Sequence, residues 1–505
     1  MWGRTWWRVG AFGVCAAALA VAGTANVAFA NIRHESRSHA AASGTLTVAV
    51  ATAVTTLSPQ PFNPADSYFE RAVYEPLIDL NGNTPVGILA TSWRFGHADR
   101  SLTIELRKNV RYSDGTPFTA TDAAWNINWV KQKSTGAQAV ALWQNVTPKV
   151  LGRYSLRLDF TRPMPDIFGM LAASLIVKPN SQQNGIGTGP FRVQSFVPGT
   201  SLTLVRNPRY WAKGEPKLQS IVFKNYPDLT TAALALQSHA ADVLFNASFT
   251  QIGSLRSAGF KYLEIPGGGA DDILINTAQA PLNNPKVREA LSLAFDRKAF
   301  VKIAAQGYET PTCSIFPVSS PAYSQANNQC TFSLAKAKKL LHEAGVSNLT
   351  LSINAASILP QTTFLPIYKQ DLASIGVTLN INVIDTATWI QESATGAFPQ
   401  LLAHIYNFGN SDPALLFSAY PFRPTGNAEH FNSSQYQYMV AHASIAGNPK
   451  NRIAQYQKID KFVQQQAFVI PLASDTTPVL YSPKVRGLKV ADGIVLNYNN
   501  ASIGS

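Results

Sequence analysis

Residues 187–211 read GTGPFRVQSFVPGTSLTLVRNPRYW and predict an antiparallel β-hairpin. Residues 191–196 and 201–206 are rich in β-forming side chains, and the four residues between them include the proline and glycine of a turn. Leucines alternate with threonine and valine in the second run, so one face can pack on a core. Tyr210 and Trp211 follow an Asn-Pro stop and are expected to bury apolar area beside this turn.

This stretch, continued to residue 223, resembles the pattern of family 5 extracellular solute-binding proteins, the oligopeptide- and dipeptide-binding partners of ABC importers. Matching blocks lie upstream in VYEPLIDL (73–80), LATSW (89–93) and LTIELRKNVRYSDGTPFTATDAAW (102–125). Downstream blocks are NPKVREALSLAFDRKAF (284–300), SLAKAKKLLHEAG (333–345) and the surroundings of Asp412-Pro413. The resemblance spans about residues 44 to 500, and the blocks occur in the order that the family has.

The resemblance implies an α/β fold of the two-lobed periplasmic-binding-protein-like (type II) architecture, with a hinge and an additional small domain. The expected order is a signal peptide at 1–30, a flexible tether at 31–43, domain I at 44–84, 184–266 and 473–505, domain II at 85–183, and domain III at 267–472. Pro266 and the glycines Gly267, Gly268 and Gly269 lie where the family crosses into its third domain, so they are the first hinge candidate. A strand at 468–472 leads to a second expected crossing near residues 473–477.

The first thirty residues predict export from the cytoplasm. Arg4 and Arg8 precede an apolar run, and Ala28-Phe29-Ala30 has the small-x-small form of a signal peptidase site. An uncleaved anchor and lipidation at Cys15 are the alternatives, but the apolar run is short for a bilayer span and no lipobox precedes the cysteine. The mature chain is therefore expected to be extracytoplasmic, in the periplasmic space or at the cell surface.

Removal of the signal leaves two cysteines, Cys313 and Cys330, separated by a loop rich in proline, serine and asparagine. An even pair in an oxidising compartment predicts a disulfide, with two unrelated free thiols as the alternative. Closing a loop of this size would stabilise the fold by roughly 3 kcal/mol on the chain-entropy model.

The 505 residues carry a formal net charge of +13, which is typical of proteins that bind anionic partners such as nucleic acid, anionic lipid or an acidic ligand. Lys and Arg occur singly or in short pairs, without an arginine-rich segment or a nucleic-acid motif, so a solvated basic surface is expected and nucleic acid is not. The 46% hydrophobic content indicates a large globular protein.

Local patterns predict individual elements along the chain. Residues 68–78 have helical spacing, and Thr119 with Asp122 resembles a capping box before the next helix. In the second half, Asn284, Asp296 and Ser333 are predicted helix caps. Further strands at 349–354 and 377–384 enclose a helix at 362–375, followed by helices at 433–445 and 449–466.

No catalytic or cofactor motif stands out. The chain has no G-x-S-x-G, H-E-x-x-H or C-x-x-C sequence, and the glycines at 185–189 lack the lysine of a P-loop. His404 and His430 could meet in space, but surface or core histidines are the simpler interpretation. We therefore expect no enzyme activity, no cofactor and no metal; a secreted hydrolase with dispersed catalytic residues is the remote alternative.

An aromatic and amide cluster late in the chain is typical of a ligand site. The predicted ligand-binding residues are Trp389, Tyr406, Phe408, Asn410, Asp412 and Arg423, with Phe62 and Asn63 carried over from the irregular stretch that reaches the ligand in relatives. Rings offer tolerant contact area and amides offer hydrogen bonds, which suits a peptide. In peptide-binding relatives an acidic residue a few positions before Asp-Pro pairs with the α-amino group of the ligand, and here Gly409 or Asn410 occupies that position. Asp412 could bind the ligand or could instead brace its own loop.

The sequence thus predicts a monomeric substrate-binding protein that captures peptides by closing two lobes and delivers them to the permease subunits of an ABC importer. A protein of the same fold for an opine, a sugar or a metal chelate is the alternative.

Overall fold

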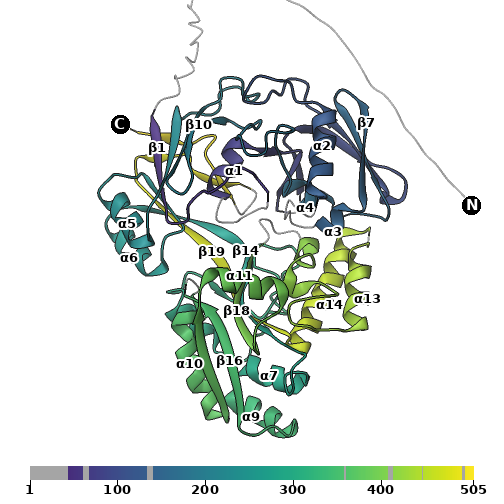
Figure 1. The fold of residues 1–505 in the computed structure, drawn as a ribbon, viewed down its shortest axis with the longest axis vertical. Coiled ribbons are helices and arrows are strands. Elements are labelled where there is room, and N and C mark those ends of the chain that lie inside the picture. The colour runs from purple at the N-terminus through teal and green to yellow at the C-terminus, as the bar shows by residue number, and fades with distance from the viewer. Residues whose placement is uncertain are drawn as a thin grey trace, which may run out of the picture. The chain divides into compact units, whose positions relative to one another are not determined.

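The predicted hairpin forms one edge of a large mixed sheet (Figure 1). The computed structural model describes residues 44–60, 67–82, 84–132, 140–165, 167–357, 360–407, 413–445, 447–491 and 495–504. In this part of the chain, strands β10 (Phe191–Val197) and β11 (Ser201–Arg206) pair antiparallel, which confirms the hairpin. Leu202 and Leu204 are fully buried, as their alternation predicts.

The sheet draws its strands from both ends of the chain. Its order is β10, β11, β12 (Ser220–Asn225), β1 (Thr45–Val50), β13 (Val243–Phe245), β19 (Val469–Tyr481), β14 (Lys261–Ile275), β18 (Leu401–Asn407), β16 (Leu349–Ala356) and β17 (Val377–Ile384), with β15 (Thr310–Pro311) paired to β19. β1 is parallel to β12 and β13, and β16 is parallel to β17 and β18, whereas the long central pair β14–β19 is antiparallel.

The glycines that precede the hairpin are required by close backbone contact. Gly189 donates its N–H to the carbonyl oxygen of Val73 at 2.9 Å. A Cβ on Gly187 would stand 2.1 Å from the same oxygen, and one on Gly189 would stand 2.7 Å from the oxygen of Ala72. Only glycine lets this stretch lie against the end of the first helix.

The predicted helix at 68–78 is shorter than its periodicity indicates. Helix α1 covers Ser67–Val73 and is followed by the short strands β2 (Glu75–Pro76) and β3 (Ile78–Asn81). Pro76 explains the correction, because proline has no N–H to donate and disfavours helical backbone in the residue before it. Leu77 is buried all the same, in the bend between β2 and β3.

Residues 84–177 contain a second, four-stranded sheet and its covering helices. The order is β5 (Ala90–Phe95), β6 (Ser101–Leu106), β8 (Ser155–Phe160) and β7 (Val146–Gly152). The associated elements are β4 (Thr84–Gly87), η2 (His97–Asp99), α2 (Ala120–Val130), α3 (Val140–Trp143), α4 (Ile167–Ala172) and β9 (Leu175–Ile176). The capping box of α2 is confirmed: the Asp122 carboxylate accepts hydrogen bonds from the backbone N–H and the hydroxyl of Thr119, both at 2.8 Å.

The remaining helices cover the large sheet or pack beside it. They are α5 (Leu229–Gln237), α6 (Phe249–Ser257), α7 (Pro285–Leu293), α8 (Arg297–Ile303), α9 (Leu334–Glu343), α10 (Gln361–Ser374), α11 (Thr386–Thr395), α12 (Pro413–Leu416), η4 (Tyr420–Phe422), α13 (Ser434–Ala443) and α14 (Pro449–Gln466). Asn284, Asp296 and Ser333 cap α7, α8 and α9 through their side chains, which confirms three predicted starts. Near the C-terminus, β20 (Val485–Arg486) pairs with β23 (Ser502–Ile503), and β21 (Lys489–Ala491) pairs with β22 (Val495–Asn497).

Two long strands link the part of the chain that contains β1 and β10 with the part that contains β16 and β18 (Figure 1). β19 continues to Tyr481, so the predicted strand at 468–472 is too short. The glycines at 267–269, expected as a free joint, lie inside β14. Pairing with β14 explains the longer β19, since it extends a strand through residues whose own β-propensity is low. The glycines lie where the register between β14 and β19 shifts.

Buried apolar side chains form separate clusters, one of which extends to both sides of this crossing. Residues of β16, β17, α7 and α10 pack around Phe295 and Tyr368 in one cluster. The cluster around Tyr68 and Phe223 lies under β1 and β12 and extends through residues 84–177. Among the described residues, no helix is long and apolar enough to cross a bilayer.

Candidate functional site

Three of the predicted ligand-binding residues, Trp389, Tyr406 and Arg423, belong to the described part of the chain. Phe62, Asn63, Phe408, Asn410 and Asp412 lie outside the described residues, as do the predicted signal peptide at 1–30 and tether at 31–43. The surroundings of the three described residues follow.

Trp389 lies on α11, a helix whose start is fixed by the Asp385 side chain, which accepts a hydrogen bond from the Thr388 N–H at 3.0 Å. Its indole N–H donates to the carbonyl oxygen of Ala403 on β18 at 2.8 Å. The ring lies 5.7 Å from that of His404, and the side chain is half-buried. The polar atom of Trp389 is therefore used internally, and the ring is what it can offer to a ligand.

Tyr406 is a core residue at the end of β18, only 4% exposed. Its hydroxyl donates to the carbonyl oxygen of Ile315 at 2.6 Å, and its ring packs edge-on against Phe422 at 5.0 Å. Burial raises the pKa of this hydroxyl well above its usual range. These contacts give Tyr406 a structural role, and ligand binding by this residue stays a prediction.

Arg423 follows η4 and carries a positive charge beside an exposed ring. Its guanidinium lies 4.4 Å over the ring of Tyr420, which is 42% exposed, and its Nε donates to the carbonyl oxygen of Ser418 at 3.1 Å. Stacking on an aromatic ring holds a guanidinium in a fixed plane, which favours bidentate binding of a carboxylate.

These residues belong to one region because α11 contacts both η4 and the neighbouring strands. Ile390 on α11 is 57% exposed, so apolar area, an aromatic ring and a guanidinium occur together there. Beneath them His404 Nδ1 lies 2.8 Å from Asp272 Oδ1, and burial raises the pKa of that carboxyl although the histidine lowers it. The exposed apolar area, the aromatic ring and the guanidinium together suit the binding of a solute with apolar and anionic groups.

The two histidines that the sequence singles out do not meet. His404 contacts Asp272, whereas His430 Nε2 lies 3.2 Å from the carbonyl oxygen of Gly396, so the two histidines have separate partners. In the part of the chain that the structure describes, no group of three or more His, Cys, Asp or Glu side chains could hold a metal ion.

The predicted hinge segments lie side by side. Pro266 pairs with Thr476 and Ala270 with Ser474, and the register shifts between these pairs. The Asp475 carboxylate accepts a hydrogen bond from the Gly269 N–H at 3.1 Å, and a Cβ on Gly267 would stand 1.6 Å from Asp475 Oδ1. The glycines therefore make room for this carboxylate; their role as a hinge stays a prediction.

A second set of contacts joins residues 84–177 to the later helices. α4 contacts α12, and Arg162 Nη1 donates to the Ser444 hydroxyl at 3.2 Å. Asp99 lies close to Gly447, since a Cβ on that glycine would stand 3.4 Å from its carboxylate. Sequence patterns gave no signal for these contacts.

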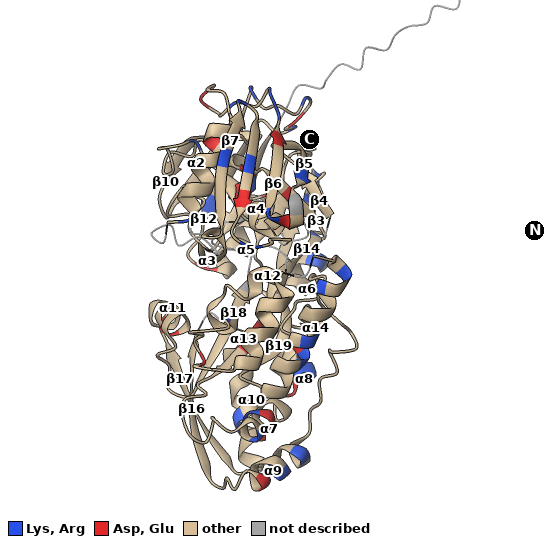
Figure 2. Ribbon diagram, turned by 90° about the vertical axis from the view of Figure 1, so that its right-hand side faces the viewer, with Lys and Arg blue, Asp and Glu red and all other residues tan. Residues whose placement is uncertain are grey.

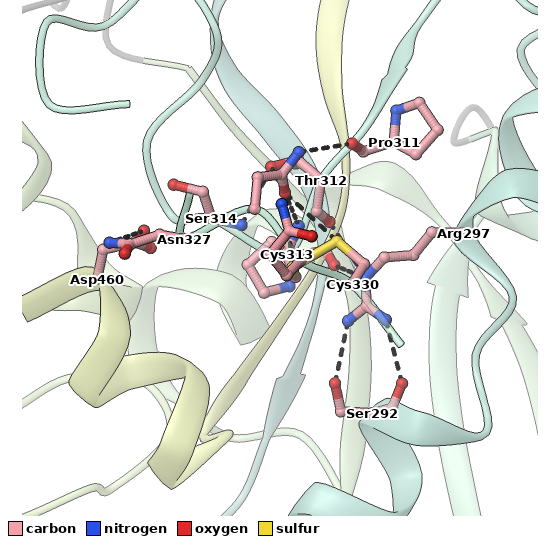
Figure 3. The surroundings of a disulfide bond; sticks show 12 residues. Ser292, Arg297, Pro311, Thr312, Cys313, Ser314, Asn327, Cys330 and Asp460 are labelled. Atoms are coloured by element: carbon pink, nitrogen blue, oxygen red, sulfur yellow. Dashed lines mark hydrogen bonds between the residues drawn. A yellow bond between two sulfur atoms is a disulfide. The ribbon is translucent and has the colours of Figure 1, made fainter. Parts of the chain in front are cut away.

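Cys313 and Cys330 are placed together as a disulfide pair with their Cα atoms 5.5 Å apart (Figure 3). The Cys313 N–H donates to Asn328 Oδ1 at 2.8 Å, and the Asp460 carboxylate accepts from the Ile315 N–H at 2.9 Å. The Arg297 Nε donates to the carbonyl oxygen of Thr312 at 3.1 Å. The enclosed loop is thus fixed at several points to its neighbours.

Two buried polar networks escaped prediction. Glu75 accepts hydrogen bonds from the Tyr210 hydroxyl at 2.8 Å and from the Trp211 indole at 3.0 Å, and Arg107 lies 4.2 Å over that indole. Burial raises the pKa of Glu75 to about 7. The second network surrounds Asp271, and its sequence signal is the pair of consecutive acids directly before the apolar residues 273–275.

Lys and Arg occur on many elements, among them α6, α9 and α14, in the view of Figure 2. This distribution agrees with the scattered basic residues of the sequence and defines no single basic element.

The chain matches a known family over most of its length. Residues 84–427 match the sequence model of bacterial extracellular solute-binding proteins, family 5. The glutathione-binding protein GsiB of Salmonella typhimurium is 26% identical over 484 residues, covering 90% of this chain and 94% of that protein.

Solved structures share the fold. A putative peptide-binding protein AppA from Clostridium difficile has a TM-score of 0.81 at 18% identity, covering 91% of this chain and 100% of that one. NikA from Brucella suis, solved in complex with Fe(III)-EDTA, has a TM-score of 0.80 at 20% identity, covering 91% and 100%. The predicted α/β, two-lobed binding-protein architecture is confirmed, and the chain belongs to family 5 of the bacterial extracellular solute-binding proteins.

Proposed function

We propose that this solute-binding protein captures peptides outside the cytoplasm and delivers them to the permease subunits of an ABC importer. Residues 1–30 would direct export, and the mature chain would act as a monomer without cofactor or catalytic activity. The observation that carries the peptide assignment is the similarity to GsiB, which extends over 94% of that protein. Glutathione, the ligand in its name, is a tripeptide.

The described site residues support a ligand with an apolar side and an acidic group. Trp389 and Tyr420 offer rings, whose contact area tolerates different side chains. The stacked guanidinium of Arg423 can bind a carboxylate, which every peptide with a free C-terminus carries. Asp412 would pair with the α-amino group, or else brace its own loop.

Capture would proceed by closure of the two lobes around the strands β14 and β19. The interrupted register at 266–270 provides a place where the backbone can bend, and the Arg162–Ser444 hydrogen bond is a contact that closure could make or break. A ligand favours closure only by the amount that it binds the closed form better than the open form. The closed form would then dock on the permease.

A non-peptide solute is the second candidate. NikA shares the fold at a TM-score of 0.80 in a complex with Fe(III)-EDTA, a chelate rather than a peptide. In addition, Gly409 or Asn410 stands where peptide-binding relatives carry the acid for the α-amino group. Arg423 would suit the carboxylates of a chelate or an opine equally well.

Mass spectrometry of the solute that co-purifies with the mature protein tests the proposal most directly. Calorimetry then compares glutathione, a dipeptide, a tetrapeptide and Fe(III)-EDTA. We expect a peptide in the mass spectrum and saturable binding of at least one peptide. A chelate or opine in the mass spectrum, with no peptide binding, would replace the first candidate by the second.

Two substitutions separate the roles of the site residues. Arg423→Ala should weaken the binding of a ligand that carries a carboxylate, and Asp412→Asn should weaken the binding of a ligand that carries an ammonium group. Each loss of binding free energy should be about 1.5 to 3 kcal/mol if the hydrogen bond is charge-assisted. Lys450→Ala, on an exposed position of α14, is the control. If Asp412→Asn lowers the melting temperature and leaves affinity unchanged, Asp412 braces its loop.

A further inference from the structure

A group of carboxyl side chains, two of them buried and one half-buried, lies at the crossing of β14 and β19. Asp271 is on β14, Asp475 is on β19, and Glu309 directly precedes β15, which pairs with β19 on its other side. Asp271 is fully buried and Glu309 is 8% exposed. We call these three residues the crossing carboxyl cluster.

Strand register places these side chains on one face of the sheet. Asp271 pairs with Ala473, and paired residues share a face, so Asp271 lies on the same face as Asp475, two residues further along β19. Pro311 pairs with Ala473 as well. Because side chains alternate between the two faces, Glu309, two residues before Pro311, lies on the same face. The small side chain of Ala473 leaves space between the acids.

The hydrogen bonds among the described residues favour a proton in this cluster. Gln361 on α10 donates to Asp271 Oδ1 at 3.0 Å. Asp271 Oδ2 and Glu309 Oε2 are both buried and receive no donor from the described residues. The two carboxyl groups are within hydrogen-bond reach of each other, so one proton shared between them satisfies both oxygens.

We propose that the crossing carboxyl cluster is a proton-dependent brace: a proton shared between Glu309 and Asp271 holds the two crossing strands in the arrangement described here, and release of that proton loosens the crossing. The brace acts at the same point as the predicted hinge, because Asp475 accepts the hydrogen bond from the Gly269 N–H. It is independent of the identity of the ligand.

The surrounding charges make the proton tightly held. Burial and the neighbouring carboxylates raise the pKa of Glu309 well above its ordinary value, and burial does the same for Asp271. The hydrogen bond between the two carboxyl groups holds one proton between them. Among the other titratable groups nearby, Asp272 on β14 and His404 and Tyr406 on β18 lie on the opposite face of the sheet. The charge of Asp272 still raises the pKa of Asp271.

The sign of the pH effect follows from linkage. A carboxyl whose pKa is raised by folding binds its proton more tightly in the folded protein than in the unfolded chain. Its contribution to stability is present at low pH and is lost as the pH rises through the folded pKa. The crossing should therefore be tightest in acid and loosen in alkali.

Hydrogen exchange of the whole protein, corrected for the intrinsic pH dependence of exchange, tests the brace without a substitution. Peptides that cover 261–275 and 469–481 should lose protection between pH 6 and pH 9, whereas peptides from α2 should not. Equal protection at both pH values in the crossing strands would overturn the proposal.

Infrared spectroscopy in deuterated buffer identifies the proton itself. At pH 7 the difference spectrum between wild type and Glu309→Gln should contain the carbonyl band of a protonated carboxylic acid. Glu264→Gln is the matched control, because Glu264 is exposed on the same strand β14, and its difference spectrum should lack that band. If Glu309→Gln does not fold, Asp271→Asn serves in its place.

Glu309→Gln should also flatten the pH dependence of exchange in both crossing strands, since glutamine can donate the same hydrogen bond at every pH. A wild-type pH response in this variant, or no protonated carboxyl in its difference spectrum, would refute the brace. Neither result bears on whether the ligand is a peptide.

Discussion

Loss of the Cys313–Cys330 disulfide should destabilise the protein by a calculable amount. The perturbation is the double substitution Cys313→Ser, Cys330→Ser. The two cysteines are 17 positions apart, and on the chain-entropy model the closure of such a loop in the unfolded chain is worth about 3 kcal/mol at 25 °C.

Hydrogen bonds of the folded loop explain why the loss of folding free energy should stay near the value of the chain-entropy model. Asn328 Oδ1 still accepts from the residue 313 N–H, and Asp460 still accepts from the Ile315 N–H, whether or not the sulfurs are bonded. The folded loop is therefore held without the bond, and the effect falls mainly on the unfolded chain.

The same loop touches both crossing strands, which extends the prediction beyond global stability. The Val318 N–H donates to the Ser474 hydroxyl at 3.1 Å, and the Ser319 hydroxyl donates to the carbonyl oxygen of Gly267 at 2.9 Å. Greater freedom of the loop should raise hydrogen exchange in peptides from both strands. Peptides from β6, which belongs to the separate four-stranded sheet, are the internal control.

Denaturant unfolding, followed by fluorescence and circular dichroism, measures the free energy; agreement of the two probes is needed before a two-state value is used. Reductant should lower the midpoint of the wild type and leave the double variant unchanged. Thiol titration of the denatured, unreduced protein should find no free thiol in the mature wild type. Two free thiols, or equal midpoints for wild type and variant, would refute the reasoning.

Three further predictions concern other parts of the molecule. Trp389→Ala should weaken ligand binding by about 1 to 3 kcal/mol, measured by calorimetry, if its ring is a central contact; unchanged affinity places the site elsewhere. Gly267→Ala should lower the melting temperature, because the new Cβ would stand 1.6 Å from Asp475 Oδ1, whereas Gly253→Ala in open space on α6 should not. Glu75, whose pKa burial raises to about 7, should contribute stability that is full below about pH 4.5 and lost as the pH rises through 7, by up to about 3 kcal/mol; the urea midpoint of the wild type should fall between pH 5 and pH 8 while that of Glu75→Gln, which carries no charge at either pH, should stay nearly constant, and parallel curves would contradict this.

The local elements could be predicted because their causes are local. Asn284, Asp296 and Ser333 cap helices through side chains a few residues from the N–H groups that they satisfy. The hairpin at 191–206 follows from its turn residues and the alternation around them. Order and type of these elements, together with the resemblance, were sufficient for the fold.

The features that the sequence predicted wrongly or incompletely depend on contacts between residues that are far apart in the chain. β19 continues past Leu472 because β14 pairs with it, and α1 stops early because Pro76 begins a different pairing with β9. The role of Tyr406 depends on Ile315, 91 positions away. A sequence pattern records periodicity and end signals; it does not record which distant carbonyl oxygen a hydroxyl will reach.

The described contacts also restrict where ligand specificity can arise. The indole N–H of Trp389 and the hydroxyl of Tyr406 both donate to backbone carbonyls of the protein, so neither has a proton left to donate to a polar ligand. Aromatic surface alone discriminates weakly, since one methylene in an apolar pocket is worth only about 1 to 3 kcal/mol. A buried polar group that the wrong ligand leaves unpaired discriminates far better. Among the described site residues only Arg423 has that capacity, because Ser418 occupies its Nε alone. The distinction between a peptide and a chelate should therefore depend on Arg423 together with residues 408–412, and much less on the rings that first mark the region as a site.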